Sequence, residues 1–260
     1  MDDVSDKLRF PPRSGNTNAD VIIIGGGIAG VMAAFHLAEK GKRIALLEKN
    51  HLGTGDTGLT TGFLSRVPDT SMSMIAQRYG FPFAQKLFEA MRTAQTDLFH
   101  LIKKHSIPCD FSLCPSHFGS YKKNDPALME EWRMYEKLDR ETVFLRDGKS
   151  RGLPFEECIQ FQNEGRWHAR KLLFSLAQKM VERGAVIAEE TEVLEIESGE
   201  KMTVRTSAGL YTAPKLLVAM GNPGSLFSEL NELVTSSLTY VIAAKYEKSP
   251  LPDELFWDTF

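Results

Sequence analysis

The most constraining feature of the sequence is a glycine-rich turn near its start, placed between a buried strand and a helix. Val21–Ile24 is a β-branched run without polar alternation, typical of a parallel strand buried on both faces. The turn Gly25-x-Gly27-x-x-Gly30 follows directly, and apolar residues then recur at helical spacing. A second apolar run over 44–47 closes a βαβ unit. The sequence therefore predicts an α/β fold around a parallel sheet.

Each glycine of this turn has its own expected role in a dinucleotide site. Gly25 permits a tight turn, Gly27 lets the backbone approach a pyrophosphate, and Gly30 allows the helix to pack closely on the strand. The amides that open the helix face the phosphates, where the helix dipole favours negative charge. Glu48 ends the second strand, where a carboxylate accepts hydrogen bonds from an adenosine ribose. In this context, dinucleotide binding is favoured over an unrelated glycine turn.

The fingerprint alone does not separate NAD from FAD. Glu48 argues against NADP, because its carboxylate would repel a 2′-phosphate. The stretch Gly53–Gly62 supplies hydroxyls and backbone amides just past the second strand, where the diphosphate and flavin of a longer cofactor would run. The same composition also suits a plain surface loop.

The rest of the chain predicts further α/β construction with an insertion. Helices are expected over 70–105, 126–140 and 172–181, and the last of these leads through a glycine into a strand over 185–188. The expected strands that follow are three short ones and a buried one, at Val193–Ile196, Met202–Thr206, Leu210–Thr212 and Leu216–Ala219. We predict a Rossmann-like, doubly wound parallel sheet with a three-stranded meander, and an inserted, incomplete α+β region.

Several of these motifs together resemble one family. The run from Val21 to Leu64 is similar to that of the D-amino-acid oxidase-like FAD-dependent oxidoreductases, which include glycine oxidases, sarcosine oxidases and amino-acid dehydrogenases. Later segments agree with the resemblance. The motifs that carry it are Gly25-Gly26-Gly27-Ile28-Ala29-Gly30, Leu47-Glu48-Lys49, Thr57-Gly58-Leu59-Thr60-Thr61-Gly62, Arg183-Gly184-Ala185-Val186-Ile187, Thr191-Glu192-Val193 and Leu217-Val218-Ala219-Met220-Gly221.

The resemblance implies FAD as cofactor and oxidation of a C–N bond of an amino acid or amine by hydride transfer to the flavin. It implies that Val193 meets the adenine side of FAD through its backbone, and that the strand ending at Gly221 passes beside the cofactor. In such a site the flavin accepts the hydride and the protein binds and orients, so we assign no catalytic residue. The expected cofactor-binding residues are Gly25, Gly27, Ile28, Ala29, Gly30, Glu48, Lys49, Thr57, Gly58, Thr60, Thr61, Val193, Ala219 and Gly221.

A narrower resemblance concerns one branch of the family. The Thr-Gly-x-Thr-Thr signature, Cys109-Asp110-Phe111 and Trp167-His168 are similar to the branch whose full-length members often carry a Rieske iron–sulfur domain after the oxidoreductase part. No cysteine here has a histidine two residues on, so this chain lacks the ligand pairs of a Rieske centre. Cys109, Cys114 and His117 are interpreted as buried structural residues rather than metal ligands.

Two histidines have suggestive positions. His168 precedes a predicted helix, and we interpret it as a helix-entry residue rather than a catalytic base. His51 follows Glu48 and borders the expected cofactor site without an assigned role.

The predicted domains are discontinuous. Residues 1–18 are polar and expected to form a flexible arm. The FAD-binding domain is expected over 19–68 and 165–235, with the substrate or cap region over 69–164 and 236–260. The segment from Ser237 opens with an extended run and ends in aromatic residues, which indicates a strand that continues into a sheet. The resemblance implies a following region that completes the substrate-facing sheet and a glycine-rich segment that returns to the flavin, and we find neither in this sequence. We therefore expect an N-terminal portion of a longer oxidoreductase.

Composition and charge narrow the possible partners and cellular location of the protein. The 31 basic and 34 acidic residues give a net charge of −3 without a basic cluster, which argues against nucleic-acid partners. The three scattered cysteines and the acidic start indicate a reducing, cytoplasmic location, and glycines interrupt the one apolar stretch, so no membrane span is expected. The expected partners are an amine or amino-acid substrate and an electron acceptor, or a missing C-terminal Rieske portion.

Two alternative functions stay open, and a third is disfavoured. The first is an NAD-dependent dehydrogenase, and the second is a non-catalytic FAD-binding fragment. A flavin hydroxylase is disfavoured, because its Asp-Gly motif belongs late in the domain, near Val218, whereas Asp147-Gly148 precedes the third parallel strand.

Overall fold

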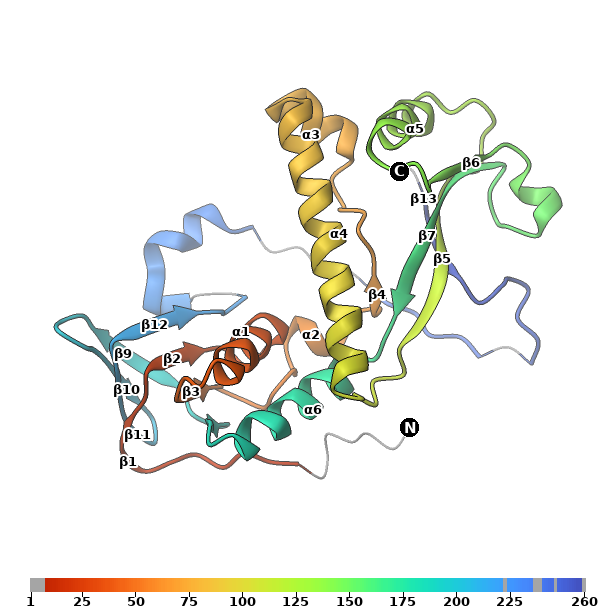
Figure 1. Ribbon diagram of the computed structural model, residues 1–260. Helices are drawn as coiled ribbons and strands as arrows, with labels where there is room; N and C mark the ends of the chain where they lie inside the picture. Colours follow the sequence, from red (N-terminus) through yellow and green to blue (C-terminus); the bar gives the residue numbers. More distant parts are fainter. Residues whose placement is uncertain (1–7, 222–223, 236–239, 246, 259–260) are drawn as a thin grey trace. The chain divides into compact units, whose positions relative to one another are not determined.

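The computed structural model describes residues 8–221, 224–235, 240–245 and 247–258 (Figure 1). Its contacts divide the chain into two compact units. The first unit contains the chain up to Thr61, Ile107–Cys109 and His168–Val241, and the second contains Gly62–Ser106, Asp110–Trp167 and Ile242–Phe260. Each unit has its own sheet and its own buried core.

The first unit is built on a parallel sheet in the order β12-β2-β3-β8. The bounds of its strands are Val21–Ile24 for β2, Ile44–Leu47 for β3, Val186–Ala188 for β8 and Lys215–Val218 for β12. All residues of β2 and β3 are buried, which confirms the two central strands expected from their uninterrupted apolar runs.

The two faces of this sheet are covered differently. Helices α1 (Ile28–Glu39) and α6 (Ala169–Glu182) pack against each other and against the sheet (Figure 1). On the other face, alternate residues such as Ile22 and Ile24 join a core with Val204 and Tyr211 of a meander. The meander consists of β9 (Val193–Glu197), β10 (Met202–Thr206) and β11 (Gly209–Ala213). These layers confirm the mixed α/β class with a three-stranded meander.

Two features of this unit differ from the sequence-based expectation. Strand β12 forms, but it is largely exposed rather than buried, because it lies at the end of the sheet and pairs only with β2 among the described strands. Part of the predicted arm is also structured. Residues Gly15–Asn18 form β1, which pairs in parallel with β11, while residues 1–7 lie outside the described residues.

The second unit combines a largely antiparallel sheet with three helices. The sheet order is β13-β5-β7-β4, with β6 also paired to β7. Its strands are β4 (Phe63–Leu64), β5 (Ser112–Ser120), β6 (Val143–Leu145), β7 (Glu157–Arg166) and β13 (Leu255–Asp258). The helices α3 (Met72–Tyr79), α4 (Phe81–Lys104) and α5 (Pro126–Leu138) confirm the helical predictions over 70–105 and 126–140.

The aromatic end of the chain enters this sheet. Strand β13 pairs in parallel with β5, and Trp257 stacks on Phe161 of β7 with ring centroids 6.3 Å apart. This confirms the predicted strand within 255–260. The extended run predicted over 238–242 falls partly outside the described residues, and Tyr240–Ile242 have no regular secondary structure.

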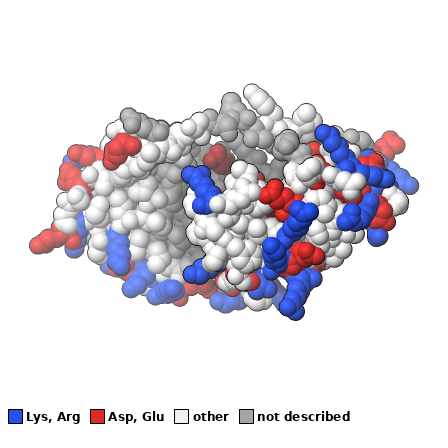
Figure 2. Space-filling model, turned by 90° about the horizontal axis from the view of Figure 1, so that it is seen from above, with Lys and Arg blue, Asp and Glu red and all other residues white. Residues whose placement is uncertain are grey.

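Charged side chains of both signs are spread over the face that Figure 2 shows. Among the described residues, no helix combines the length and the apolar character that a membrane span requires.

Candidate cofactor site

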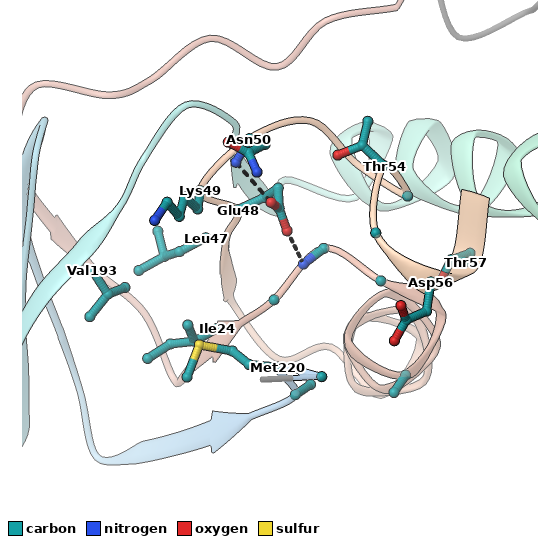
Figure 3. Close-up of a pocket in the computed structure, with 18 of the residues that line it drawn as sticks. Ile24, Leu47, Glu48, Lys49, Asn50, Thr54, Asp56, Thr57, Val193 and Met220 are labelled. Atoms are coloured by element: carbon teal, nitrogen blue, oxygen red, sulfur yellow. Dashed lines mark hydrogen bonds between the residues drawn. The ribbon is translucent and has the colours of Figure 1, made fainter. Parts of the chain in front are cut away.

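A cavity of about 710 Å³ lies in the first unit, where β2 and β3 end and α1 begins (Figure 3). Its lining comes from four stretches of the chain that the parallel sheet brings to one edge. The lining residues are Ile24, Gly25, Gly26, Gly27, Ile28, Ala29, Leu47, Glu48, Lys49, Asn50, Gly53, Thr54, Gly55, Asp56, Thr57, Thr191, Glu192, Val193, Ala219, Met220, Gly221, Gly224 and Leu226.

The glycine turn forms one wall of the cavity, and its glycines differ in what surrounds them. Gly25 has φ +112°, and a Cβ there would overlap the carbonyl of Ala219. A Cβ on Gly30 would overlap the carbonyl of Gly25, so this helix packs directly on the turn. These observations bear out the turn and packing roles expected of the two glycines. A Cβ on Gly27 would meet only the Thr57 Oγ1, at 3.4 Å, because this residue faces the cavity.

The carboxylate of Glu48 is oriented by backbone amides. Its Oε2 accepts a hydrogen bond from Gly26 N at 2.7 Å, and its Oε1 accepts one from Asn50 N at 2.8 Å (Figure 3). An ionised carboxylate offers about four lone-pair sites, so two remain for other donors. Glu48 also lines the cavity. Its fixed carboxylate can therefore accept hydrogen bonds from hydroxyl groups of a ligand there.

The Gly/Thr-rich stretch forms the neighbouring wall. It contains the single turn α2 (Asp56–Leu59), in which Thr57 Oγ1 accepts a hydrogen bond from Ile28 N at 3.0 Å. Gly53 N donates to the carbonyl of Gly26 at 3.0 Å, which ties this stretch to the glycine turn. The first half of the stretch, Gly53–Thr57, therefore lines the cavity beside the opening turn of α1, whereas residues 58–62 lie outside the lining.

The third wall comes from the segments after β8 and β12. Thr191 N donates to the carbonyl of Glu48 at 2.8 Å, which places Val193 beside the second strand. Ala219 N donates to the carbonyl of Ile24 at 2.8 Å and brings Gly221 to the rim. Lys49 and Glu192 form an ion pair at 2.7 Å on the same rim, and this hydrogen bond raises the pKa of the lysine.

Ten of the expected cofactor-binding residues lie together on the cavity wall, and four do not. Gly30 and Gly58 pack against backbone, while Thr60 and Thr61 are exposed outside the lining. Sequence reasoning missed Gly26, whose amide holds Glu48, and Asn50, whose position two residues after Glu48 was an available signal. It also missed Met220, although this residue lies within one of the motifs that carry the resemblance, and Leu226, for which the sequence carried no distinct signal.

A model of one protein family matches residues 20–259, almost the whole chain. Its description is "FAD dependent oxidoreductase". The chain belongs to the FAD dependent oxidoreductase family.

Curated relatives of the chain support the assignment to this family. It is 28% identical over 211 residues to the putative Rieske 2Fe-2S iron–sulfur protein YhfW of Bacillus subtilis, a match spanning 78% of this chain and 40% of that protein. It is 30% identical over 220 residues to the probable oxidoreductase OrdL of Rhizobium meliloti, spanning 81% and 51%. The gamma-glutamylputrescine oxidoreductase of Escherichia coli is 25% identical over 215 residues, spanning 81% and 50%. The chain thus spans about half the length of these curated relatives.

Solved structures support the fold of this member of the FAD dependent oxidoreductase family. Glycine oxidase from Geobacillus kaustophilus matches with a TM-score of 0.65 and 21% identity, covering 83% of this chain and 59% of that one. The amino acid oxidase NikD matches with a TM-score of 0.63 and 21% identity, covering 82% and 54%.

The histidines and cysteines of the chain lie outside the cavity lining. His168 is the N-cap of α6, where its Nδ1 accepts a hydrogen bond from Lys171 N at 3.4 Å, as expected of a helix-entry residue. All three cysteines are buried. Within the described ranges, no group of three or more His, Cys, Asp or Glu residues has an arrangement suited to a metal ion.

Proposed function

We propose that the first unit binds FAD in the cavity at the N-terminus of α1. The observation that carries this proposal is the glycine turn closing on the amide-oriented carboxylate of Glu48, in a chain of the FAD dependent oxidoreductase family. Gly27 leaves the cavity wall free of a side chain where the amides of α1 begin. A helix N-terminus favours a phosphate, and a carboxylate favours ribose hydroxyls, so the donor and acceptor set suits a dinucleotide.

Individual residues receive proposed positions from this geometry. The amides of Gly27 and Ala29 hold the diphosphate, and Glu48 holds the adenosine ribose. Ile28, whose amide donates to Thr57 Oγ1, contributes to the cavity wall beside them. Lys49 and Val193 border the adenosine end, because both lie beside Glu48 on the rim. Thr57 fixes the opening of α1, and Ala219 and Gly221 form the facing wall. Gly25, Gly30 and Gly58 shape the backbone, while a cofactor contact by Thr60 and Thr61 stays a prediction of the resemblance.

We propose that the whole protein oxidises a C–N bond of an amine or amino acid. When bound, the flavin supplies the hydride acceptor for such a reaction. The support comes from relatives: the glycine oxidase, the amino acid oxidase and the gamma-glutamylputrescine oxidoreductase act on amines or amino acids by their names. The first unit would be the FAD-binding domain and the second the substrate region. The YhfW relative suggests an iron–sulfur domain or protein as one electron acceptor, with oxygen or a carrier as others.

We further propose a cytoplasmic, reducing location, which the small number of scattered cysteines supports. The family match favours FAD over the alternative of an NAD-dependent dehydrogenase.

The test is a visible absorption spectrum of the purified protein, followed by anaerobic titration with amino acids and secondary amines. We expect the spectrum of bound oxidised flavin, and bleaching by at least one substrate of these classes. A colourless protein that cannot be reconstituted with FAD would overturn the cofactor proposal. Bound FAD that no amine or amino acid bleaches would overturn the proposed reaction and favour a non-catalytic FAD-binding role.

A further inference from the structure

Glu189, directly after β8, is a buried carboxylate that joins two distant parts of the first unit. The residue is 2% exposed. Its Oε1 accepts a hydrogen bond from Leu52 N at 2.7 Å, and its Oε2 accepts one from Phe10 N at 3.0 Å. His51 Nδ1 lies 3.7 Å from the same Oε2. Glu189 does not line the cofactor cavity, so any influence on the cofactor acts through the backbone that it holds.

The Leu52 contact leads to the glycine turn. Leu52 is fully buried, and its Cδ2 lies 2.5 Å from the position that a Cβ on Gly26 would take. The leucine side chain therefore fills the space left by this glycine. Gly26 N in turn donates to the carboxylate of Glu48. One contact path thus runs from Glu189 through Leu52 and Gly26 to the proposed ribose acceptor.

Backbone hydrogen bonds reinforce the same connection. Glu48 N donates to the carbonyl of Ala188 at 2.9 Å, and Glu190 N donates to that of Asn50 at 2.9 Å. The Thr191 hydroxyl donates to the carbonyl of Glu189 at 2.8 Å, and Thr191 itself lines the cavity. Residues 48–52, which follow β3, are therefore hydrogen-bonded to residues 188–191, which follow β8. Glu189 supplies the side-chain hydrogen bond of this connection, to Leu52.

The N-terminal segment meets the same residue. Glu189 N donates to the carbonyl of Phe10 at 2.8 Å, so these two residues exchange hydrogen bonds in both directions. Phe10 is 7% exposed, and the chain beyond it continues into β1. This anchor explains why the segment before the first parallel strand is fixed at Phe10 although its sequence is polar.

We propose that Glu189 is a positioning residue for the cofactor cavity. Its carboxylate fixes Leu52, and through it Gly26 and Glu48, in the geometry that the dinucleotide requires, and anchors the N-terminal segment at the same point. This inference rests on the proposed FAD site. A carboxyl group suits the position because both facing groups are N–H donors, whereas a carboxamide would turn its own N–H toward one of them. A buried amide that loses its acceptor is costly, so the loop would open in such a variant.

The experiment compares Glu189→Gln with Glu190→Gln in the full chain. Glu190 is the exposed neighbour, and the substitution removes the same charge. Met180→Ala, at a buried residue in the last turn of α6, provides a control that loses stability, because Met180 takes no part in the hydrogen bonds between residues 48–52 and 188–191. Hydrogen exchange of the Leu52 amide in the apoprotein reports the contact, and titrations with FAD and ADP report the cavity.

We expect faster exchange at Leu52 in Glu189→Gln, and dissociation constants for FAD and ADP raised by about tenfold. We expect Glu190→Gln to behave as the wild type, and Met180→Ala to lose stability while keeping its affinity. Unchanged exchange at Leu52 would overturn the inference, as would affinity losses no larger than those of Met180→Ala. Should Glu189→Gln fail to fold, deletion of residues 1–10 removes both hydrogen bonds between Phe10 and Glu189 but keeps the one between Leu52 and Glu189. This deletion should raise both dissociation constants more modestly, and unchanged constants would then refute the inference. A wild type that does not bind FAD would refute the proposed function instead. In that case, hydrogen exchange of the Leu52 amide would still show whether Glu189 holds this amide.

Discussion

Gly26 N donates a 2.7 Å hydrogen bond to the carboxylate of Glu48, and so connects the glycine turn to the end of the second parallel strand. The two residues belong to neighbouring strand ends of a buried sheet. The acidic residue of the dinucleotide fingerprint is therefore a structural part of the turn as well as a proposed ligand for the ribose. This double role makes the effect of its replacement predictable.

Glu48→Gln should weaken FAD binding, because the carboxamide is a poorer acceptor for Gly26 N and for ribose hydroxyls. Hydrogen bonds to a charged group contribute about 1.5–3 kcal/mol, so we expect a dissociation constant raised about ten- to a hundredfold. Quenching of flavin fluorescence measures it. Glu195→Gln, on the exposed surface of β9, serves as the control and should bind as the wild type. Equal affinities for the two variants would refute the role of Glu48.

The glycines of the turn should separate folding from binding. Gly25→Ala and Gly30→Ala should destabilise the first unit, because each new methyl group overlaps a backbone carbonyl. Gly27→Ala should leave the apoprotein nearly as stable as the wild type and lower only its affinity for FAD. Thermal unfolding with and without FAD measures both effects. Gly199→Ala, whose Cβ would be 3.7 Å from its nearest neighbour, is the control. A Gly27→Ala protein with wild-type affinity would contradict the position proposed for the diphosphate.

Thr57 should act through its hydroxyl oxygen. Thr57→Val keeps the shape but removes the acceptor that Ile28 N uses at 3.0 Å. We expect a loss of about 1 kcal/mol in FAD binding, about fivefold in the dissociation constant, and recovery in Thr57→Ser. The same titration measures both variants. A Thr57→Ser protein as weak as Thr57→Val would show that the methyl group, not the oxygen, matters.

In the second unit, Arg66 should be a major contributor to stability. Its guanidinium lies 3.1 Å from carboxylate oxygens of both Glu164 and Asp139, and all three side chains are almost fully buried. Burial raises the pKa of Glu164, which shows how costly its isolated charge would be. Arg66→Ala should lower the free energy of unfolding by about 3–5 kcal/mol. In urea unfolding, Arg92→Ala, which removes an exposed pair with Glu89, should cost under about 1 kcal/mol. Similar losses for both variants would contradict this prediction.

His117 should make the second unit less stable in acid. The histidine is fully buried, with Nε2 2.6 Å from a Glu254 oxygen and Nδ1 3.7 Å from Cys158 Sγ. Burial raises the pKa of Cys158 to about 11, so its thiol stays protonated. In the neutral tautomer with the proton on Nε2, Nε2–H donates to the Glu254 carboxylate and Nδ1 accepts from the thiol, so both contacts are satisfied. Burial also lowers the pKa of His117 below 6.5, although Glu254 opposes this shift.

Because the folded state disfavours the imidazolium, the unfolded state takes up the proton first as the pH falls. The contribution of His117 is therefore present above pH 6.5 and lost as the pH drops below that value. Between about pH 7.5 and pH 5.5, the unfolding free energy of the wild type should fall by up to about 1.4 kcal/mol per pH unit from this group. His117→Gln should flatten this dependence, whereas His100→Gln, on the exposed side of α4, should not. Identical slopes in all three proteins would contradict the assignment.

The parts of the fold that the sequence predicted depend on local patterns. Two uninterrupted apolar runs predicted β2 and β3. The glycine spacing predicted the turn, because Gly30 packs on Gly25 within the same short segment, whereas the contact of Gly25 with Ala219 could not be predicted. The placement of Glu48 also followed from the end of a strand. The hydrogen bond between Glu48 and Gly26 could not be predicted in this way, because the Gly26 amide belongs to the turn that follows the other strand, β2.

The features of the fold and site that could not be predicted depend on contacts between residues far apart in the chain. Leu216–Ala219 looks buried by composition, but β12 lies at the end of its sheet and its neighbours decide its exposure. Strand β7 was not predicted because it contains the buried acids Glu157 and Glu164, which Asn124 and Arg66 stabilise from elsewhere in the chain. The Gly/Thr-rich stretch contains several threonines, and its sequence does not distinguish them. The placement of α2 shows that Thr57, rather than Thr60 or Thr61, faces Ile28.

The central claim is that the cavity between the glycine turn and Glu48 binds FAD. Equilibrium titration of the apoprotein with FAD, carried out in parallel on the wild type and Gly27→Val, tests it most directly. We expect one FAD per wild-type chain, and binding at least about a hundredfold weaker in Gly27→Val, whose side chain would project into the cavity. A wild type that does not saturate with FAD, or a Gly27→Val protein that binds it equally well, would contradict the claim.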